Sequence, residues 1–150
     1  MKKMNKTVFV STPITGFDDM QEFLIFKERA VFIIAVLKNL GYFVYNEFEK
    51  VEDESCFDSP SKSVDDDFNK ITNSDYFIFV HPRKMQTSSF IELGYACALQ
   101  KPIIIISKYG NLPFLAKGLC ESRLSARFIE FDEKNNVIEN RLKQLLSENK

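Results

Sequence analysis

The sequence predicts an α/β fold, a doubly wound five-stranded parallel sheet covered by helices on both faces. Short runs rich in β-branched and aromatic residues alternate along the chain with longer stretches of helical periodicity. Two of these runs, 76–80 and 103–106, are almost wholly apolar, which is typical of central strands buried on both faces. A length of 150 residues favours a single domain, residues 1–150.

The first half of the chain is expected to hold two strands and two helices. Residues 7–10 read as a buried strand, and a helix is expected from about 18 to 40, where Gly41 ends it. A second strand over 42–45 precedes a charged loop over 47–62. The next helix is expected over 63–73, with Ser61 or Ser63 as its N-cap.

The second half continues the alternation. The third strand, 76–80, leads into a loop over 81–84 in which His81 is expected to be exposed or bonded within the loop, not a catalytic base. A helix over 89–99, the fourth strand over 103–106 and a short helix over 112–119 follow. The fifth strand is expected over 127–131 and a terminal helix over 136–146.

Composition and charge exclude several classes of protein. The net charge is −1, with no long run of one sign, so no nucleic-acid partner is expected. The most apolar segment, Val31 to Leu37, is far too short to span a membrane. The three cysteines, Cys56, Cys97 and Cys120, match no zinc or disulfide spacing, so we expect reduced thiols and a cytoplasmic protein.

The segment from Val31 to Leu37 also bears on oligomeric state. It is apolar on every side of the predicted helix and must therefore be covered all round. One face of the sheet covers one side, and a partner subunit could cover the other, which predicts a homodimer. A helix buried deeply within the chain's own core is the alternative.

A ligand in such a sheet is expected where the strand order reverses, beyond the carboxyl ends of the strands. With the flavodoxin-like (Rossmann-like) order 2-1-3-4-5, this point lies between the first and third strands. The loops 11–17 and 81–88 meet there, and the second leads into the helix that begins near Ser89. Free N–H groups and the helix dipole favour an anion at that end, and the hydroxyls of Ser88 and Ser89 add to them.

Two carboxylates stand in unexpected places. Asp67 falls on the apolar stripe formed by Val64, Phe68 and Ile71, where it is costly unless paired or hydrogen-bonded. Alternatively, it is one of three acids that favour the dipole at a helix start. Glu92 is nearly alone on an apolar helix; it is either a functional acid or the end of a capping box, Ser89-x-x-Glu92.

The segments that contain these acids resemble a known family. Residues 67–75, 88–96 and 101–103, with the first loop and residues 44–46, are similar to the nucleoside 2-deoxyribosyltransferase superfamily. They look most like its small N-glycosidases, which hydrolyse pyrimidine or deoxynucleoside 5′-monophosphates. The resemblance covers nearly the whole chain and implies one flavodoxin-like domain that is usually a dimer and acts on a nucleotide or nucleoside. It implies that Glu92 is the catalytic carboxylate and Asp67 its helper.

The chemistry of that family suits these residue types. Breaking a C1′–N bond builds positive charge on the sugar, which carboxylates stabilise. Glu92 could attack C1′ or activate water, and Asp67 could hold a sugar hydroxyl or pass a proton to the base. No metal and no cofactor is expected. The predicted substrate-binding residues are Ser11, Thr12, Pro13, Ile14, Phe17, Asn46, Ser88 and Ser89.

Two other functions stay open at this point. TIR-like domains share the architecture and cleave NAD with a glutamate, so an NAD glycohydrolase is one alternative. A nucleotide-binding sensor without turnover is the other, because Ser88 stands where the family often has the glycine of a Ser-x-Gly-Thr loop. Arg83 and Lys84 either attract a phosphate or form a solvated loop.

Overall fold

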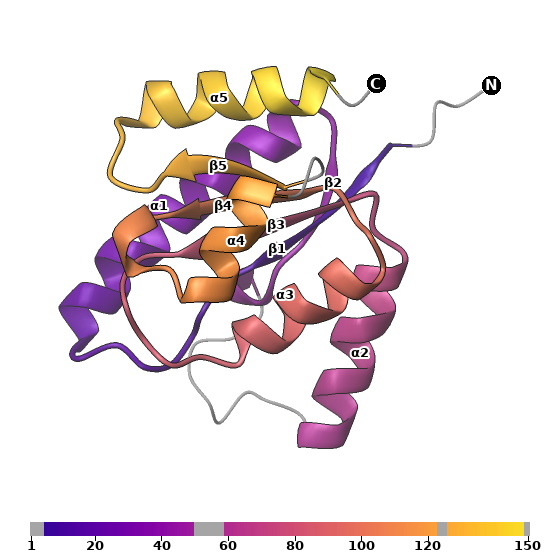
Figure 1. Cartoon of the computed structure of the whole chain (residues 1–150), viewed down its shortest axis with the longest axis vertical. Coiled ribbons are helices and arrows are strands. Elements are labelled where there is room, and N and C mark those ends of the chain that lie inside the picture. Colours follow the sequence, from indigo (N-terminus) through magenta and orange to yellow (C-terminus); the bar gives the residue numbers. More distant parts are fainter. Residues whose placement is uncertain (1–4, 50–58, 123–125, 149–150) are drawn as a thin grey trace.

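The computed structural model describes residues 5–49, 59–122 and 126–148, so Cys56 lies outside the described residues. All strand pairs are parallel and the sheet order is β2-β1-β3-β4-β5, which confirms the predicted fold (Figure 1). The strands are β1 (Thr7–Ser11), β2 (Phe43–Tyr45), β3 (Tyr76–His81), β4 (Ile103–Ser107) and β5 (Ala126–Glu130).

Helices cover both faces of this sheet (Figure 1). The side chains of α1 (Met20–Asn39) and α5 (Asn135–Glu148) form one buried core with one face of the strands. Those of α2 (Pro60–Thr72), α3 (Ser89–Ala98) and α4 (Phe114–Ser122) form a second core with the other face. Two short 3₁₀ turns, η1 (Glu47–Glu49) and η3 (Tyr109–Asn111), complete the described elements.

The start of α2 differs from the prediction. The helix begins at Pro60, with Ser59 as its N-cap, and not at residue 63 with Ser61 or Ser63 as the cap. The Ser59 hydroxyl accepts a hydrogen bond from the Lys62 N–H at 3.3 Å. Proline suits the first helical position, because its fixed φ is helical and its missing N–H would have no partner there. Residues 59–62, which were predicted as the end of the charged loop, are therefore the start of a helix.

The apolar side chains of α1 are covered mostly by the chain itself. Four of the seven residues from 31 to 37 are buried, and they share a core with three leucines of α5. The helix α5 therefore covers part of the surface that a partner subunit was expected to cover, while Val31 is 48% exposed. The homodimer stays a prediction. No helix within the described ranges is long and apolar enough to cross a membrane.

His81 is not a loop residue. It is the last residue of β3 and is fully buried, with its ring stacked on Phe79 at 5.4 Å and edge-on to Phe90 at 4.9 Å. Neither ring nitrogen has a hydrogen-bond partner in the described part of the chain. Burial, helped by the positive charge of Arg83, lowers the pKa of His81 to about 4, so the ring is neutral near pH 7.

Candidate active site

A cavity of about 630 Å³ opens where the order of strands reverses, beside the loops that follow β1, β2 and β3. This is the position that the strand order predicted for a ligand. Its lining includes four acids and several hydroxyl groups. The lining residues are Thr12, Ile14, Thr15, Glu47, Pro60, Ser63, Val64, Asp66, Asp67, Phe68, Lys70, Thr87, Ser88, Ser89, Ile91 and Glu92.

Glu92 lies in the first turn of α3 and lines this cavity. The capping box that would have explained it structurally does not form. Ser88, not Ser89, is the N-cap; its backbone is helical and its side chain makes no capping bond. The Ser89 hydroxyl instead lies 3.1 Å from the Thr87 hydroxyl, and no hydrogen bond joins Glu92 to the start of its own helix in the described structure. Glu92 is therefore left to face the cavity.

The surroundings of Glu92 favour its neutral form. Loss of hydration on burial is the largest cause, followed by the negative charge of Asp67, and together they raise the pKa of Glu92 to about 8. The Ser11 hydroxyl faces the carboxyl group and opposes this rise. Its geometry falls short of a hydrogen bond, because Ser11 Oγ bonds to no described residue. The buried hydroxyl of Ser11 is thus available to stabilise an ionised Glu92.

Asp67 reaches the same cavity from the middle of α2. Burial is again the largest cause of its raised pKa, which is about 7. The charge of Glu47 and a hydrogen bond shared with that carboxyl group also raise it, whereas Lys70 lowers it. Asp67 is half-buried beside another acid, so it holds a proton that can leave near pH 7.

Glu47 is the main site residue that the sequence prediction missed. It begins η1, two residues after β2, and its carboxylate lies 4.0 Å from the ammonium of Lys70. The prediction placed it at the start of a charged loop. The signal was its position: an acid just beyond the carboxyl end of a strand beside β1 lies at the edge where ligands bind.

The other predicted site residues divide into two groups. Thr12, Ile14, Ser88 and Ser89 line the cavity together with Glu92 and Asp67. The positions of Pro13, Phe17 and Asn46 do not support direct substrate contacts, because none of the three is part of the cavity wall.

Phe17 and Asn46 instead hold other parts of the protein. The Phe17 ring packs 5.3 Å from Phe23 and 5.2 Å from Phe26, on the α1 side of the sheet. The Asn46 amide donates to Val10 O at 2.7 Å and to Thr12 Oγ1 at 3.0 Å, and its oxygen accepts from the Phe48 N–H. Asn46 therefore ties η1 to the end of β1 and orients Thr12.

The described site is rich in acids, with four carboxyl groups and one lysine in its wall. No group of three or more His, Cys, Asp or Glu side chains in residues 5–49, 59–122 and 126–148 could hold a metal ion. A protonated acid beside a second acid can supply the proton donor and the nucleophile or base of a cleavage reaction.

Comparison with protein-family models and with curated proteins gives no match. Solved structures do match. A CMP N-glycosidase from Clostridium botulinum, BcmB, is similar with a TM-score of 0.66 and 24% identity, over 92% of this chain and 99% of that one. BlsM is similar with a TM-score of 0.62 and 17% identity, over 95% of this chain and 93% of that one.

A third similar structure is a 2-deoxyribosyltransferase from Leishmania mexicana. Its TM-score is 0.50 and its identity 17%, over 69% of this chain and 65% of that one. The chain shares their fold. These neighbours have the fold that the resemblance to the nucleoside 2-deoxyribosyltransferase superfamily implies for this chain, and identities of 24% and 17% show the fold alone.

Proposed function

We propose that this chain cleaves the N-glycosidic bond of a nucleotide or nucleoside, by hydrolysis or by transfer. Glu92 serves as nucleophile or base, and Asp67 assists. The observation that carries this proposal is the convergence of the two acids, from two helices, on one cavity where the pKa of each is raised. Similar folds in a CMP N-glycosidase and a 2-deoxyribosyltransferase support the class of reaction.

In the first step, a carboxylate oxygen of Glu92 forms a bond to C1′ of the sugar. The C1′–N bond breaks, and its electron pair leaves with the base, which takes a proton from Asp67. The product of this step is a glycosyl ester on Glu92 and a free base. The pKa of Asp67, about 7, suits a proton donor that works near neutral pH.

In the second step, water attacks C1′ and the ester bond to Glu92 breaks. The ionised Asp67 takes the proton of that water, so both acids return to their starting states. If another base attacks in place of water, the same intermediate gives transfer. In an alternative path, Glu92 removes a proton from water as the water attacks C1′, and no ester forms.

Ionisation of Glu92 is the demanding part of this mechanism, since burial and the charge of Asp67 keep its carboxyl group neutral at pH 7. Positive charge on the sugar favours the ionised form as the C1′–N bond lengthens. The Ser11 hydroxyl is placed to donate to that form. The ionised form of Glu92 is thus favoured more in the transition state, where its charge accelerates the reaction, than in the ground state.

The remaining parts of the proposal concern the whole protein. We propose a single deoxyribosyltransferase-like domain over residues 1–150, acting as a cytoplasmic homodimer on a small-molecule substrate without a cofactor. Separation by size at several protein concentrations tests the dimer.

Release of free base tests the proposed activity. The purified chain is incubated with a panel of ribo- and deoxynucleosides, their 5′-monophosphates and NAD, and products are separated by chromatography. We expect free base from at least one nucleoside or monophosphate, and loss of that release in Glu92→Gln. Release of nicotinamide alone would instead support the NAD glycohydrolase. Binding without release by the wild type would support a sensor.

The control is Glu28→Gln, which makes the same chemical change on the exposed side of α1. It should release base at the wild-type rate. Both variants should show the wild-type circular dichroism spectrum, so that lost activity is not lost folding. Equal activity in Glu92→Gln and the wild type would contradict the assignment of Glu92.

A further inference from the structure

Two loops supply much of the cavity wall. The loop after β1 contributes Thr12, Ile14 and Thr15, and the loop before α3 contributes Thr87 and Ser88. These loops are far apart in the sequence, so the shape of the cavity depends on what holds one against the other.

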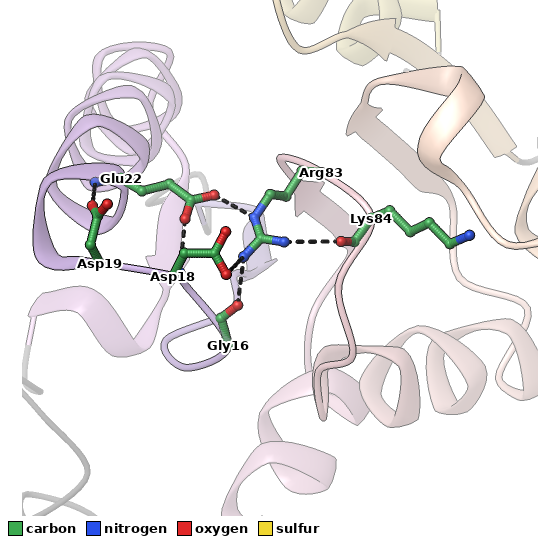
Figure 2. A network of polar contacts seen from close by, with 6 residues as sticks. All are labelled: Gly16, Asp18, Asp19, Glu22, Arg83 and Lys84. Atoms are coloured by element: carbon green, nitrogen blue, oxygen red, sulfur yellow. Dashed lines mark hydrogen bonds and ion pairs between the residues drawn. The ribbon is translucent and has the colours of Figure 1, made fainter.

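Arg83 joins the two loops (Figure 2). It follows β3, and its guanidinium group points toward the loop after β1 and the start of α1. Nη2 donates to Gly16 O at 2.9 Å and lies 3.3 Å from Asp18 Oδ1, and Nε donates to Glu22 Oε1 in a short contact. Nη1 donates to Lys84 O at 3.1 Å, within its own loop. All three nitrogens of the group are therefore engaged, and Arg83 is not part of the cavity wall.

The partners of Arg83 are themselves fixed at the start of α1. The Asp18 N–H donates to the other oxygen of Glu22 at 2.9 Å, and the Glu22 N–H donates to Asp19 Oδ1 at 2.8 Å. Asp19 is the N-cap of α1, a helix of 20 residues packed on the sheet. The network is thus anchored at the capped start of a long helix. Arg83 links both loops to that helix.

Gly16 is the point of contact between the loops. Its backbone φ is +89°, a conformation that residues other than glycine rarely adopt. A Cβ atom there would lie 3.0 Å from the Met85 side chain and 3.1 Å from Gln86 O, both in the loop before α3. The backbone of the loop after β1 therefore packs closely against the loop before α3 at Gly16. The carbonyl oxygen of Gly16 also accepts the hydrogen bond from Arg83.

We infer that Arg83 is a positioning residue that holds the loop carrying Thr12, Ile14 and Thr15 in place beside the two acids. This inference rests on the proposed function for its effect on turnover, but not for its effect on the loop. Arg83 acts through the backbone of Gly16 and through Glu22, and it does not line the cavity. Arg83 is therefore neither of the two things that its sequence position predicted, a phosphate ligand or a solvated loop residue, because its guanidinium group is bonded to Gly16, Asp18 and Glu22.

The kinetic test uses the whole chain and whichever substrate of the panel releases base. In Arg83→Gln we expect KM to rise about tenfold, because the substrate must order the loop on binding, with kcat reduced less than about threefold. Arg83→Lys keeps the charge but not the planar fork, so it should give an intermediate KM. Lys84→Gln, a matched change at the next residue, should leave both constants unchanged, because only the Lys84 carbonyl is in the network.

Hydrogen exchange measured by mass spectrometry tests the same inference without any substrate. Peptides that cover residues 14–19 should exchange faster in Arg83→Gln than in the wild type, with Arg83→Lys between them, and peptides from β4 should not change. If Arg83→Gln does not fold, the comparison rests on Arg83→Lys. Unchanged exchange over 14–19, or a KM equal to that of the wild type, would overturn the inference.

The two proposals fail in different ways. If the wild type releases no base from any substrate, the proposed function fails, and the exchange experiment still decides whether Arg83 holds the loop. If the wild type releases base but the Arg83 variants lower kcat without changing KM, the proposed function stands and the positioning inference is wrong.

Discussion

The rings of Phe68 and Tyr95 lie face to face, with centroids 3.9 Å apart and planes within 3° of parallel. Phe68 follows Asp67 on α2, and Tyr95 lies three residues after Glu92 on α3. The stack therefore joins the two helices that carry the proposed catalytic acids. Thr72 Oγ1 donates to Phe68 O at 2.7 Å and so can accept the Tyr95 hydroxyl, 2.9 Å away, which adds a polar contact to the same joint.

Removing the stack between Phe68 and Tyr95 should displace Asp67 and Glu92 relative to each other while both acids stay in the protein. In Tyr95→Ala we expect a loss of kcat of about tenfold or more, because small displacements of catalytic groups are costly. Tyr95→Phe keeps the ring and loses only the contact with Thr72, so its kcat should stay within about threefold of the wild type. Rates measured at saturating substrate check the order of the two variants. Equal losses in both would show that the hydroxyl, not the stack, aligns the helices.

The dependence of activity on pH should report the two acids. The proposed reaction needs one of them protonated and the other ionised. Their pKa values are about 7 for Asp67 and about 8 for Glu92, so kcat/KM should follow a bell with its maximum between these values. Measurement from about pH 5 to about pH 10 checks this. A profile that is flat from about pH 6 to about pH 9 would contradict the use of these acids in turnover.

Asp67→Asn should change that profile as well as the rate. The charge of Asp67 raises the pKa of Glu92, so its removal should lower that pKa below about 8 and leave the ionisation of Glu92 as the single step that sets the profile. The alkaline limb should disappear, and the rate should fall about 10²- to 10⁴-fold with loss of the proton donor. Asp65→Asn is the matched control, since Asp65 is exposed on the same helix and lies outside the cavity wall. A midpoint that stays at about pH 8 in Asp67→Asn would mean that the pKa of Glu92 does not depend on Asp67.

The order and type of the elements follow from the sequence because they depend on short-range patterns. The apolar strands and the glycine just past the end of α1, Gly41 with a φ of +91°, are local features of this kind. The prediction of a ligand position between β1 and β3 follows from strand order alone. What the sequence predicted less well depends on tertiary packing: α5 covers the second side of α1, and β3 extends to bury His81.

The residues of the candidate site also differ in whether a local sequence pattern or only tertiary packing reveals them. Glu92 and Asp67 could be singled out, because each is an acid on an apolar surface of its helix. Glu47 could not be assigned to the cavity in this way, since it lies in a predicted loop without a helical stripe and only the pairing of β2 with β1 brings it to Asp67. The contacts of Arg83 with Gly16, Asp18 and Glu22 span more than 60 residues, so no local pattern predicts them.

Glu92→Gln should make the protein more stable at alkaline pH. The pKa of Glu92 rises from an ordinary 4.5 to about 8 on folding, so the folded state binds the proton more tightly than the unfolded state. The resulting stability is present below about pH 4.5 and is lost as pH rises through about 8. Glutamine is neutral at every pH and avoids this loss. Thermal unfolding should therefore show little difference at pH 5 and a higher Tm for the variant at pH 9. A constant difference between the two conditions would mean that Glu92 is not desolvated.

His81 should give the opposite dependence at acid pH. Burial lowers its pKa from 6.5 to about 4, so below about pH 6.5 the unfolded state binds a proton that the folded state does not. Stability is therefore lost as pH falls from about 6.5 to about 4. His81→Leu replaces a ring whose two nitrogens have no described hydrogen-bond partner with an apolar side chain of similar volume. We expect the variant to be the more stable protein, with an advantage that grows by more than about 1 kcal/mol between pH 7 and pH 4. Urea unfolding at the two pH values measures this difference. An advantage that stays constant would show that the buried imidazole takes up its proton in the folded state.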